Sequence, residues 1–331
     1  MAGRFPFSGL PRGWYVAATS DELARRSVVA RRYFGRDLVL FRTESGVARM
    51  ADAHCPHLGA HLGHGGTVEG ETLRCPFHGF RFDGDGACVA TPSGGRLPAR
   101  AQLRTWPLRE QSGLVLAWFD AEDKAPDWEV PALATEGWTP LGWKTYEVNT
   151  HPQETTENSV DFGHFTQVHN FLSARMTRAV ATDGPLLRSG YVIERSLDMI
   201  GLPKRGVRAE FEVSVWGLGY SLVELQLPRF GLRYRLFVLP IPVDEEHIEL
   251  RLACAGERRM GPLGLVFRNI LLKAFSFEVE EDIPIWNRKV YRDVPALAPG
   301  DEPVAVYRRW ARQFYPPPRD AGDRAAPMLD T

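Results

Sequence analysis

Short apolar runs, separated by glycine turns, predict β-strands in the first third of the chain. DLVLFR at 37–42, GVARMA at 46–51 and GLVLAWF at 113–119 have the length and pattern of strands. The next stretch, 121–140, is rich in proline, charged and small residues, which is typical of a linker. We therefore expect an all-β first domain over residues 1–120, followed by this linker.

Beyond the linker the pattern mixes strands with helices. WKTYEVN at 143–149 and HIELRLAC at 247–254 are predicted strands, and in the second of them every other residue is apolar. Acidic residues and threonines open a predicted helix over 154–172. A longer helix is predicted over 262–281, and Pro284 is expected to end or kink it.

A short amphipathic helix, VAVYRRWARQFY, closes the second domain, which we place at residues 141–317. The remaining residues, 318–331, have the composition of a disordered tail. Glycine (31 residues) and proline (25 residues) are abundant, which favours turn-rich β structure over a helical bundle. The predicted fold class is therefore α+β, with an all-β domain ahead of a mixed one.

Composition and charge exclude several classes of function. Hydrophobic content of 44% and charged content of 24% are globular values, and a net charge of −1 gives no reason to expect a nucleic-acid partner. The most apolar run, 261–275, carries Arg268 and Lys273, so we expect no transmembrane segment. The start of the chain lacks the pattern of a signal peptide. We expect a cytoplasmic protein, in which Cys/His pairs more often bind metal than form disulfides.

The candidate chemistry begins with two Cys-Pro segments, AHCPHLGAHLGHGG and CPFHGFRFDGDG, which contain Cys55-x-His57 and Cys75-x-x-His78. Two thiolates and two imidazoles can hold a tetrahedral zinc ion, or a two-iron cluster with cysteines on one iron and histidines on the other. Each segment supplies one cysteine and one histidine, whereas zinc fingers of the two-cysteine, two-histidine kind place both cysteines on one element. The mixed loops therefore favour a two-iron cluster.

Three further histidines and two further cysteines fall outside this spacing. We interpret the histidines as loop or surface residues: His54, His61 and His64. We interpret Cys88 and Cys254 as small packed hydrophobic residues.

A second candidate metal site lies in ENSVDFGHFTQVHN, which contains Asn158, Asp161, His164 and His169. On a helix Asp161 and His164 are about 60° apart and share a face. His164 and His169 are about 140° apart, so they can bind one ion only if the helix bulges or breaks between them. We therefore predict an irregularity near residues 165–168.

Two histidines need a carboxylate to complete the 2-His-1-carboxylate triad of non-haem Fe(II), which leaves positions open for O2. Acidic candidates cluster in FEVEEDIPIWNRKVY, namely Glu278, Glu280, Glu281 and Asp282. An acidic run of this kind is usually a solvated helix face, and the residues alone do not choose among the four.

Both motifs are identified as those of Rieske non-haem iron oxygenases. CPHLGAHLGHGG…LRCPFHGFRFDGDGAC resembles the Rieske [2Fe–2S] domain. N-x-x-D-x-x-H-x-x-x-x-H, with EDIPIW…YRRWARQFY downstream, resembles the catalytic domain of the steroid branch, that is, of 3-ketosteroid 9α-hydroxylase oxygenase components and Neverland-type cholesterol 7-desaturases. The resemblance implies an N-terminal all-β Rieske domain and a C-terminal helix-grip catalytic domain, an antiparallel sheet with helices. Phe80 departs from the pattern, since a tryptophan commonly follows the second Rieske histidine.

The resemblance also assigns roles. It implies that Cys55 and Cys75 ligate one iron of the cluster, that His57 and His78 ligate the other, and that His164, His169 and Asp282 hold mononuclear Fe(II). Asp161 becomes the bridge that passes electrons from a neighbouring subunit's Rieske histidine, and Asn158 supports the ligands. The implied partners are O2 as cosubstrate, a separate NAD(P)H-dependent reductase or ferredoxin, and two further copies of the chain in a homotrimer.

The expected activity is oxidation of a hydrophobic polycyclic substrate, a sterol or ketosteroid, by hydroxylation, desaturation or oxidative demethylation. Candidate pocket residues are Phe211, Trp216, Phe230, Tyr234 and Phe237. Alternatives are an aromatic-ring dihydroxylase or an O- or N-demethylase on the same scaffold. Two non-enzymatic alternatives are a Rieske electron carrier with a binding domain and a zinc-stabilised binding protein.

Overall fold

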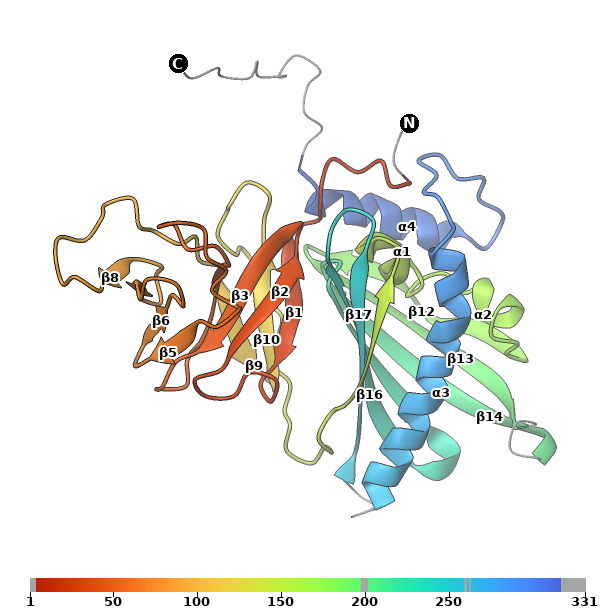
Figure 1. Ribbon diagram of the computed structural model, residues 1–331. Coiled ribbons are helices and arrows are strands. Elements are labelled where there is room, and N and C mark those ends of the chain that lie inside the picture. Colours follow the sequence, from red (N-terminus) through yellow and green to blue (C-terminus); the bar gives the residue numbers. More distant parts are fainter. Residues whose placement is uncertain (1–3, 198–201, 259–260, 262, 317–331) are drawn as a thin grey trace.

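The computed structural model describes residues 4–197, 202–258, 261 and 263–316. Within these residues, three small antiparallel sheets make up the N-terminal region (Figure 1). Their strands, in spatial order, are β1 (Gly13–Thr19), β10 (Leu114–Phe119) and β9 (Leu108–Gln111); β2 (Val28–Tyr33), β3 (Arg36–Arg42) and β4 (Ala48–Asp52); and β5 (Thr67–Glu69), β6 (Thr72–Arg74), β7 (Arg81–Phe82) and β8 (Cys88–Ala90). The all-β prediction for this region is confirmed, and β3, β4 and β10 are the three strands predicted there.

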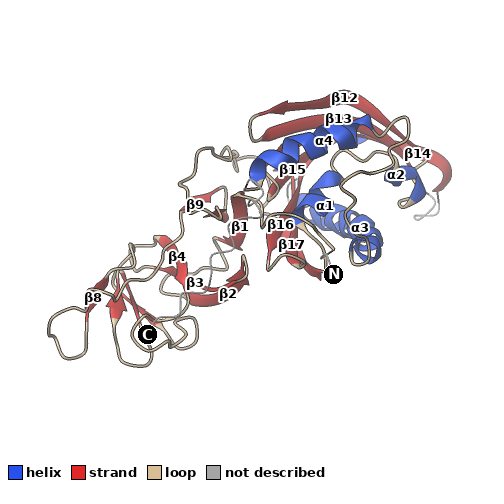
Figure 2. Ribbon diagram, turned by 90° about the horizontal axis from the view of Figure 1, so that it is seen from above, coloured by secondary structure: helices blue, strands red, loops and turns tan. Residues whose placement is uncertain are grey.

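A seven-stranded antiparallel sheet forms the centre of the second region. Its strands, in spatial order, are β11 (Gly142–Val148), β17 (Ile248–Gly256), β16 (Leu232–Pro242), β15 (Tyr220–Leu227), β14 (Leu202–Trp216), β13 (Leu186–Leu197) and β12 (Ser173–Asp183). The strands predicted at 143–149 and 247–254 are thus β11 and β17. Seen from above, the sheet curves around the helices α1 (Pro152–Glu157) and α3 (Leu263–Trp286) (Figure 2).

The two regions are packed together through apolar strands. Every residue of β1 and β10 is buried, because these strands lie between the rest of the N-terminal region and the large sheet. Trp14 and Leu116 share one apolar cluster with Leu222 and Phe237 of the large sheet. Burial of such side chains stabilises the contact by roughly 1.5–3 kcal/mol each, so the regions hold a defined relative position.

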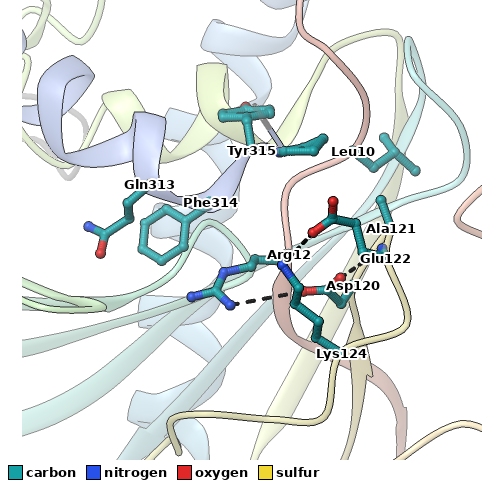
Figure 3. Close-up of a pocket in the computed structure, with 10 residues that line it drawn as sticks. Leu10, Arg12, Asp120, Ala121, Glu122, Lys124, Gln313, Phe314 and Tyr315 are labelled. Carbon is teal, nitrogen blue, oxygen red and sulfur yellow. Dashed lines mark hydrogen bonds and ion pairs between the residues drawn. The ribbon is translucent and has the colours of Figure 1, made fainter. Parts of the chain in front are cut away.

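Polar contacts add to this joint. The Arg12 amide donates to the Phe314 carbonyl oxygen at 2.7 Å, and the Arg12 guanidinium pairs with Asp127 at 2.9 Å. The guanidinium also lies 3.9 Å from Asp120, beside a small cavity of about 170 Å³ (Figure 3). The end of the second region is therefore tied to the start of the first.

The helices differ in part from the prediction. A single helix over 154–172 is wrong, since the structure has two short helices, α1 and α2 (His164–Gln167). Gly163 and Asn158 are poor helix formers, and the Ser159 carbonyl accepts a hydrogen bond from the Ser189 hydroxyl at 3.1 Å instead of continuing the helix.

The two later helices agree better. α3 contacts β11 and β17, and it continues to Trp286 with Pro284 inside its last turn, so the proline does not end it at once. α4 (Glu302–Ala311), followed by a 3₁₀ turn over Arg312–Phe314, is the predicted closing helix. A 3₁₀ turn over Pro228–Phe230 (η2) links β15 to β16.

None of the helices in the described residues is long and apolar enough to cross a bilayer. The predicted tail at 318–331 lies outside the described residues.

Two candidate metal centres

The two Cys-Pro loops are built alike. The Gly59 amide donates to the Cys55 carbonyl at 2.9 Å, and the Gly79 amide donates to the Cys75 carbonyl at 3.1 Å. Gly59 has φ of 76° and Gly79 has φ of 68°, a left-handed conformation that favours glycine. The glycines seen in the sequence therefore close two matching loops, each of which presents one cysteine and one histidine.

The four predicted ligands of these loops meet as two pairs, the two cysteines and the two histidines. Cys55 and Cys75 are buried, and burial together with the neighbouring thiol raises the pKa of Cys55 to about 11. A bound metal ion reverses that preference, because it binds the thiolate. The ring centroids of His57 and His78 are 4.8 Å apart. Nδ1 of His78 is buried without a hydrogen-bond partner among the described residues. Two neighbouring buried thiols and two neighbouring imidazoles, one of them with an unpartnered nitrogen, fit an iron–sulfur cluster.

The spacing argues against one zinc ion at this site. A tetrahedral zinc needs four ligand atoms at about 2.0–2.3 Å, which brings them within about 4 Å of one another. In the described part of the chain, only His164, His169 and Asp282 have ligand atoms that all lie within 4.8 Å of one another. No three of the four loop residues lie that close together. Thiolates on one iron and imidazoles on another allow the wider spacing.

The remaining histidines and cysteines behave as interpreted. His54 and His64 are exposed and His61 is half-buried, and the three rings neighbour one another on the loop surface. Cys88 and Cys254 are buried and unbridged. Phe80, the departure from the pattern, stacks on His57 with 4.3 Å between the ring centroids, so it covers one face of that imidazole.

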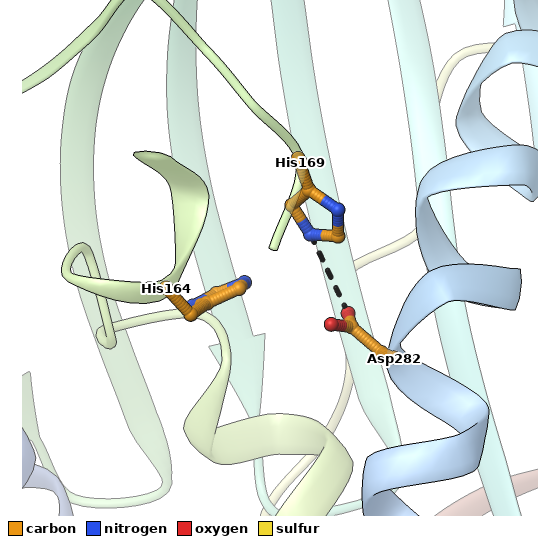
Figure 4. A group of neighbouring side chains, drawn as sticks. All are labelled: His164, His169 and Asp282. Atoms are coloured by element: carbon orange, nitrogen blue, oxygen red, sulfur yellow. Dashed lines mark ion pairs between the residues drawn. The ribbon is translucent and has the colours of Figure 1, made fainter. Parts of the chain in front are cut away.

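The second candidate centre comes from distant parts of the chain. His164 begins α2, His169 follows its end, and Asp282 lies near the end of α3 (Figure 4). Their ligand atoms lie within 4.8 Å of one another, and His169 Nε2 is 3.6 Å from Asp282 Oδ2. Nδ1 of His164 is buried without a hydrogen-bond partner in the described residues. Two imidazoles and one carboxylate in this arrangement fit an Fe(II) ion with open positions.

The end of α2 brings the two imidazoles together. The predicted break between His164 and His169 is confirmed, because α2 ends at Gln167. The described residues contain no π-bulge here. Instead the Val168 amide closes the last turn on the His164 carbonyl at 2.7 Å, and Asn170 takes a left-handed φ of 53°. The chain turns sharply, and both rings face one point.

The four acidic candidates on α3 face different partners. Asp282 faces the two histidines, and Glu281 Oε2 is 3.0 Å from His169 Nδ1. Glu280 points outward to Lys144 and Tyr146. Glu278 pairs with Arg195 inside the sheet. Sequence reasoning considered Glu281 only as a rival ligand and missed it as a partner of His169, and no spacing rule would have found that contact.

Further side chains orient the candidate ligands. The Asn158 amide donates to Asp282 Oδ2 at 2.9 Å. Asp161 Oδ2 lies 3.6 Å from His164 Nδ1; burial opposes its ionisation, but His164 holds the pKa of Asp161 below its usual value. Burial raises the pKa of Asp282, while the two histidines act in the opposite direction. Such neighbours fix the orientation of metal ligands and tune their affinity.

An apolar cavity of about 520 Å³ opens beside this centre. It is lined by inward-facing residues of β13 to β16, by α3, and by His164, His169 and Asp282. Phe211 and Phe230 line it as expected; Trp216, Tyr234 and Phe237 are not among its described lining residues. Volume and apolar walls suit a hydrophobic small molecule.

Comparison with known proteins gives two family matches. Residues 13–107 match the Rieske [2Fe-2S] domain, and residues 117–315 match the 3-ketosteroid 9alpha-hydroxylase C-terminal domain. Cholesterol 7-desaturase nvd 1 of Ciona intestinalis is 31% identical over 92% of this chain and 68% of its own. A probable 3-ketosteroid-9-alpha-monooxygenase oxygenase component of Rhodococcus rhodochrous is 30% identical over 92% of this chain and 79% of its own.

Solved structures support the fold. Dicamba monooxygenase bound to 3,6-dichlorosalicylic acid superposes with a TM-score of 0.75, at 20% identity over 91% of this chain and 96% of that one. NdmA of Pseudomonas putida CBB5 with caffeine superposes with a TM-score of 0.71, at 23% identity over 90% of this chain and 89% of that one. At these identities the likeness establishes a shared architecture and leaves the substrate open.

Proposed function

Because this chain belongs to the family of Rieske oxygenases with a 3-ketosteroid 9α-hydroxylase C-terminal domain, we propose that it is a terminal oxygenase component that oxidises a sterol or ketosteroid. As a family member it is an oxidoreductase with a Rieske [2Fe–2S] cluster and a mononuclear iron, and O2 is its cosubstrate. The observation that carries the substrate class is the apolar cavity of about 520 Å³ beside His164, His169 and Asp282. The two relatives compared above are named for a sterol and a ketosteroid, which supports the same class.

The chain's own residues prepare this cavity for the reaction. His164, His169 and Asp282 would hold the iron, which when bound supplies O2 activation next to the substrate. Asn158 holds the Asp282 carboxylate, and Glu281 holds the His169 ring. The apolar walls exclude water and place an unreactive C–H bond against the centre.

Electron delivery is proposed to run between subunits. Cys55 and Cys75 would bind one iron of the cluster, and the more exposed His57 and His78 would bind the other. In one chain the loops beside β5 to β8 lie at the opposite end from α2, which supports delivery to a neighbouring copy in a homotrimer (Figures 1 and 2). Asp161, with 38% of its side chain exposed, is the proposed bridge into His164.

The cluster is proposed to receive its electrons from a separate NAD(P)H-dependent reductase or ferredoxin in the cytoplasm. Leu58 and Phe77 lie on the two loops and are 65% and 62% exposed, which supports docking of protein partners at that tip. We assign residues 1–120 to the Rieske domain, 121–140 to a linker and 141–317 to the catalytic domain. The sequence has no glycine-rich nucleotide fingerprint that would serve NADH binding within the chain itself.

A product assay tests the proposal. The iron-loaded protein, a surrogate NADH-dependent reductase and O2 are incubated with a panel of ketosteroids and sterols, and products are identified by mass spectrometry. We expect the addition of an oxygen atom or the loss of two hydrogens on at least one steroid, and no product with His169→Ala. Turnover of aromatic methyl ethers or methylxanthines alone would favour the demethylase alternative. If the cluster is reduced but no compound of the panel causes O2 consumption, the result would favour the electron-carrier alternative.

A further inference from the structure

One ion pair interrupts the apolar wall of the substrate cavity. Tyr191, Ile193 and Arg195 alternate along β13 and all line the cavity, so the third inward position carries a guanidinium. Arg195 Nη1 donates to Glu278 Oε1 of α3 at 2.5 Å, and Glu278 lines the same cavity. Arg195 is the only Lys or Arg among the described lining residues.

Stability does not account for this pair. An ion pair removed from water loses hydration that its own attraction barely offsets, and apolar residues of similar volume are often as good or better. The pair is also accessible to an occupant, since 27% of the Arg195 side chain and 23% of the Glu278 side chain remain exposed. In ligand cavities a few polar groups on apolar walls fix the orientation of the ligand.

The pair is separate from the metal centre. Glu278 precedes Asp282 by one helical turn, about 6 Å along the axis. Tyr191, whose hydroxyl interacts with Glu278, belongs to this second place. The other polar lining residues are Asp282 and Trp286 near the end of α3, or lie on the segment 155–169: Thr155, Asn158, Ser159, His164 and His169. A molecule that fills the cavity therefore meets polar atoms both at the metal centre and at this second place.

Resting on the proposed function, we propose that Arg195 and Glu278 form a subsite that binds an uncharged oxygen, a keto or hydroxyl group, of the polycyclic substrate. Glu278 offsets the charge of Arg195 and would repel a second carboxylate, so the pair disfavours an anionic substrate. A guanidinium N–H donates to either kind of oxygen, and the Glu278 carboxylate accepts from a hydroxyl. An oxygen held there determines which carbon of the ring system faces the metal centre.

Equilibrium binding to the iron-loaded protein tests the subsite without any turnover. The probes are 5α-androstane and its 3-one and 17-one derivatives, and ligand binding is followed by tryptophan fluorescence. We expect at least one ketone to bind about tenfold more tightly than the hydrocarbon, which is the effect of one hydrogen bond to a charged donor. In Arg195→Met this preference disappears while the hydrocarbon binds at least as well. Arg208→Met, on the exposed part of β14, is the matched control and keeps the preference.

The outcomes separate this inference from the proposed function. If wild type binds all three probes equally, or if Arg195→Met weakens all three equally, the subsite is refuted while the steroid cavity stands. If wild type binds none of them, the proposed substrate class itself fails. Glu278→Gln keeps the volume of the side chain, so it guards against misfolding; it is expected to keep hydrocarbon binding and to shift the positions oxidised. If Glu278→Gln oxidises the same positions as wild type and keeps the same preference for the ketones, Glu278 is not part of the subsite.

Discussion

The two candidate metal centres are built in opposite ways. At the Rieske loops the cysteines are buried, while His57 and the apolar residues Leu58 and Phe77 are exposed at the surface. At the second centre the side chains of His169 and Asp282 are only 4% and 8% exposed and face an internal cavity. The first arrangement suits exchange of electrons with other proteins, and the second suits chemistry that must exclude water.

The two centres also differ in how much of the fold each needs. The four predicted ligands of the first lie within 24 residues of sequence, on the loop from β4 to β5 and on the loop from β6 to β7. The predicted ligands of the second come from α2, from the turn that follows it and from α3, more than 100 residues later. The first centre therefore depends on local turns, and the second depends on the packing of helices against the whole seven-stranded sheet.

The largest expected effect separates the two centres completely. In His169→Ala we expect the mononuclear iron to be lost, so that iron falls from about three to about two atoms per chain and product formation is abolished. The red-brown absorbance of the cluster should remain, because none of its loops is touched. Iron analysis and visible spectra measure both. His64→Ala, an exposed imidazole of the first region, is the control; retention of all three irons in His169→Ala would refute the assignment.

The next effect tests the link between the centres. Asp161→Asn removes the carboxylate beside His164 but keeps its size, and we expect turnover to fall on the order of 100-fold, as for other groups that orient a metal ligand. Both metals and ketosteroid binding should remain. Steady-state rates, iron content and binding are compared with wild type. A loss of iron in proportion to the loss of rate would instead make Asp161 a structural support of His164.

The contrast between local and distant assembly explains what the sequence could predict. Short spacings and turn glycines indicate Cys55, His57, Cys75 and His78 as candidate ligands of one metal centre, and the family resemblance predicts a two-iron cluster there. The helix predicted over 154–172 is wrong, because the Ser159 carbonyl accepts a hydrogen bond from the Ser189 hydroxyl of β13 instead of continuing the helix. Helical periodicity still required a break between the two histidines, and that requirement was met.

The choice among the acidic residues marks the limit of the sequence. The local pattern does not choose among the four acidic residues, and only the position of α3 against the sheet separates the partners of Glu278, Glu281 and Asp282. Family resemblance selected Asp282, since local chemistry did not. The pair of Arg195 with Glu278 joins residues 83 positions apart, so no local pattern indicates it.

A smaller effect is expected from the partner of His169. Glu281→Gln keeps a hydrogen-bonding oxygen near Nδ1 but removes the negative charge, and we expect Fe(II) affinity to fall about tenfold. Glu280→Gln is a matched control on the adjacent residue, because Glu280 faces outward to Lys144. Iron retention is measured during titration with a chelator. Equal affinity in the two variants would show that Glu281 only borders the site.

The smallest effect tests how dry the catalytic cavity is. Burial raises the pKa of Glu278 to about 7, although the charge of Arg195 opposes the shift. A carboxyl group with a raised pKa in the folded state favours folding fully below its ordinary pKa of 4.5 and loses that contribution as pH rises through about 7. Wild type should therefore lose thermal stability relative to Glu278→Gln between pH 5 and pH 8.

The expected difference is a shift of the melting temperature of about 3 °C, at equal iron loading of both proteins. Glu280 serves as the comparison, because its hydrogen bonds to Lys144 and Tyr146 lower its pKa. Wild type and Glu280→Gln both keep Glu278, so their melting temperatures should change in parallel between pH 5 and pH 8. Parallel curves for wild type and Glu278→Gln would mean that water reaches Glu278 freely. The second centre would then resemble the exposed loops of the first, and the division between a wet electron-transfer site and a dry oxidation site would no longer hold.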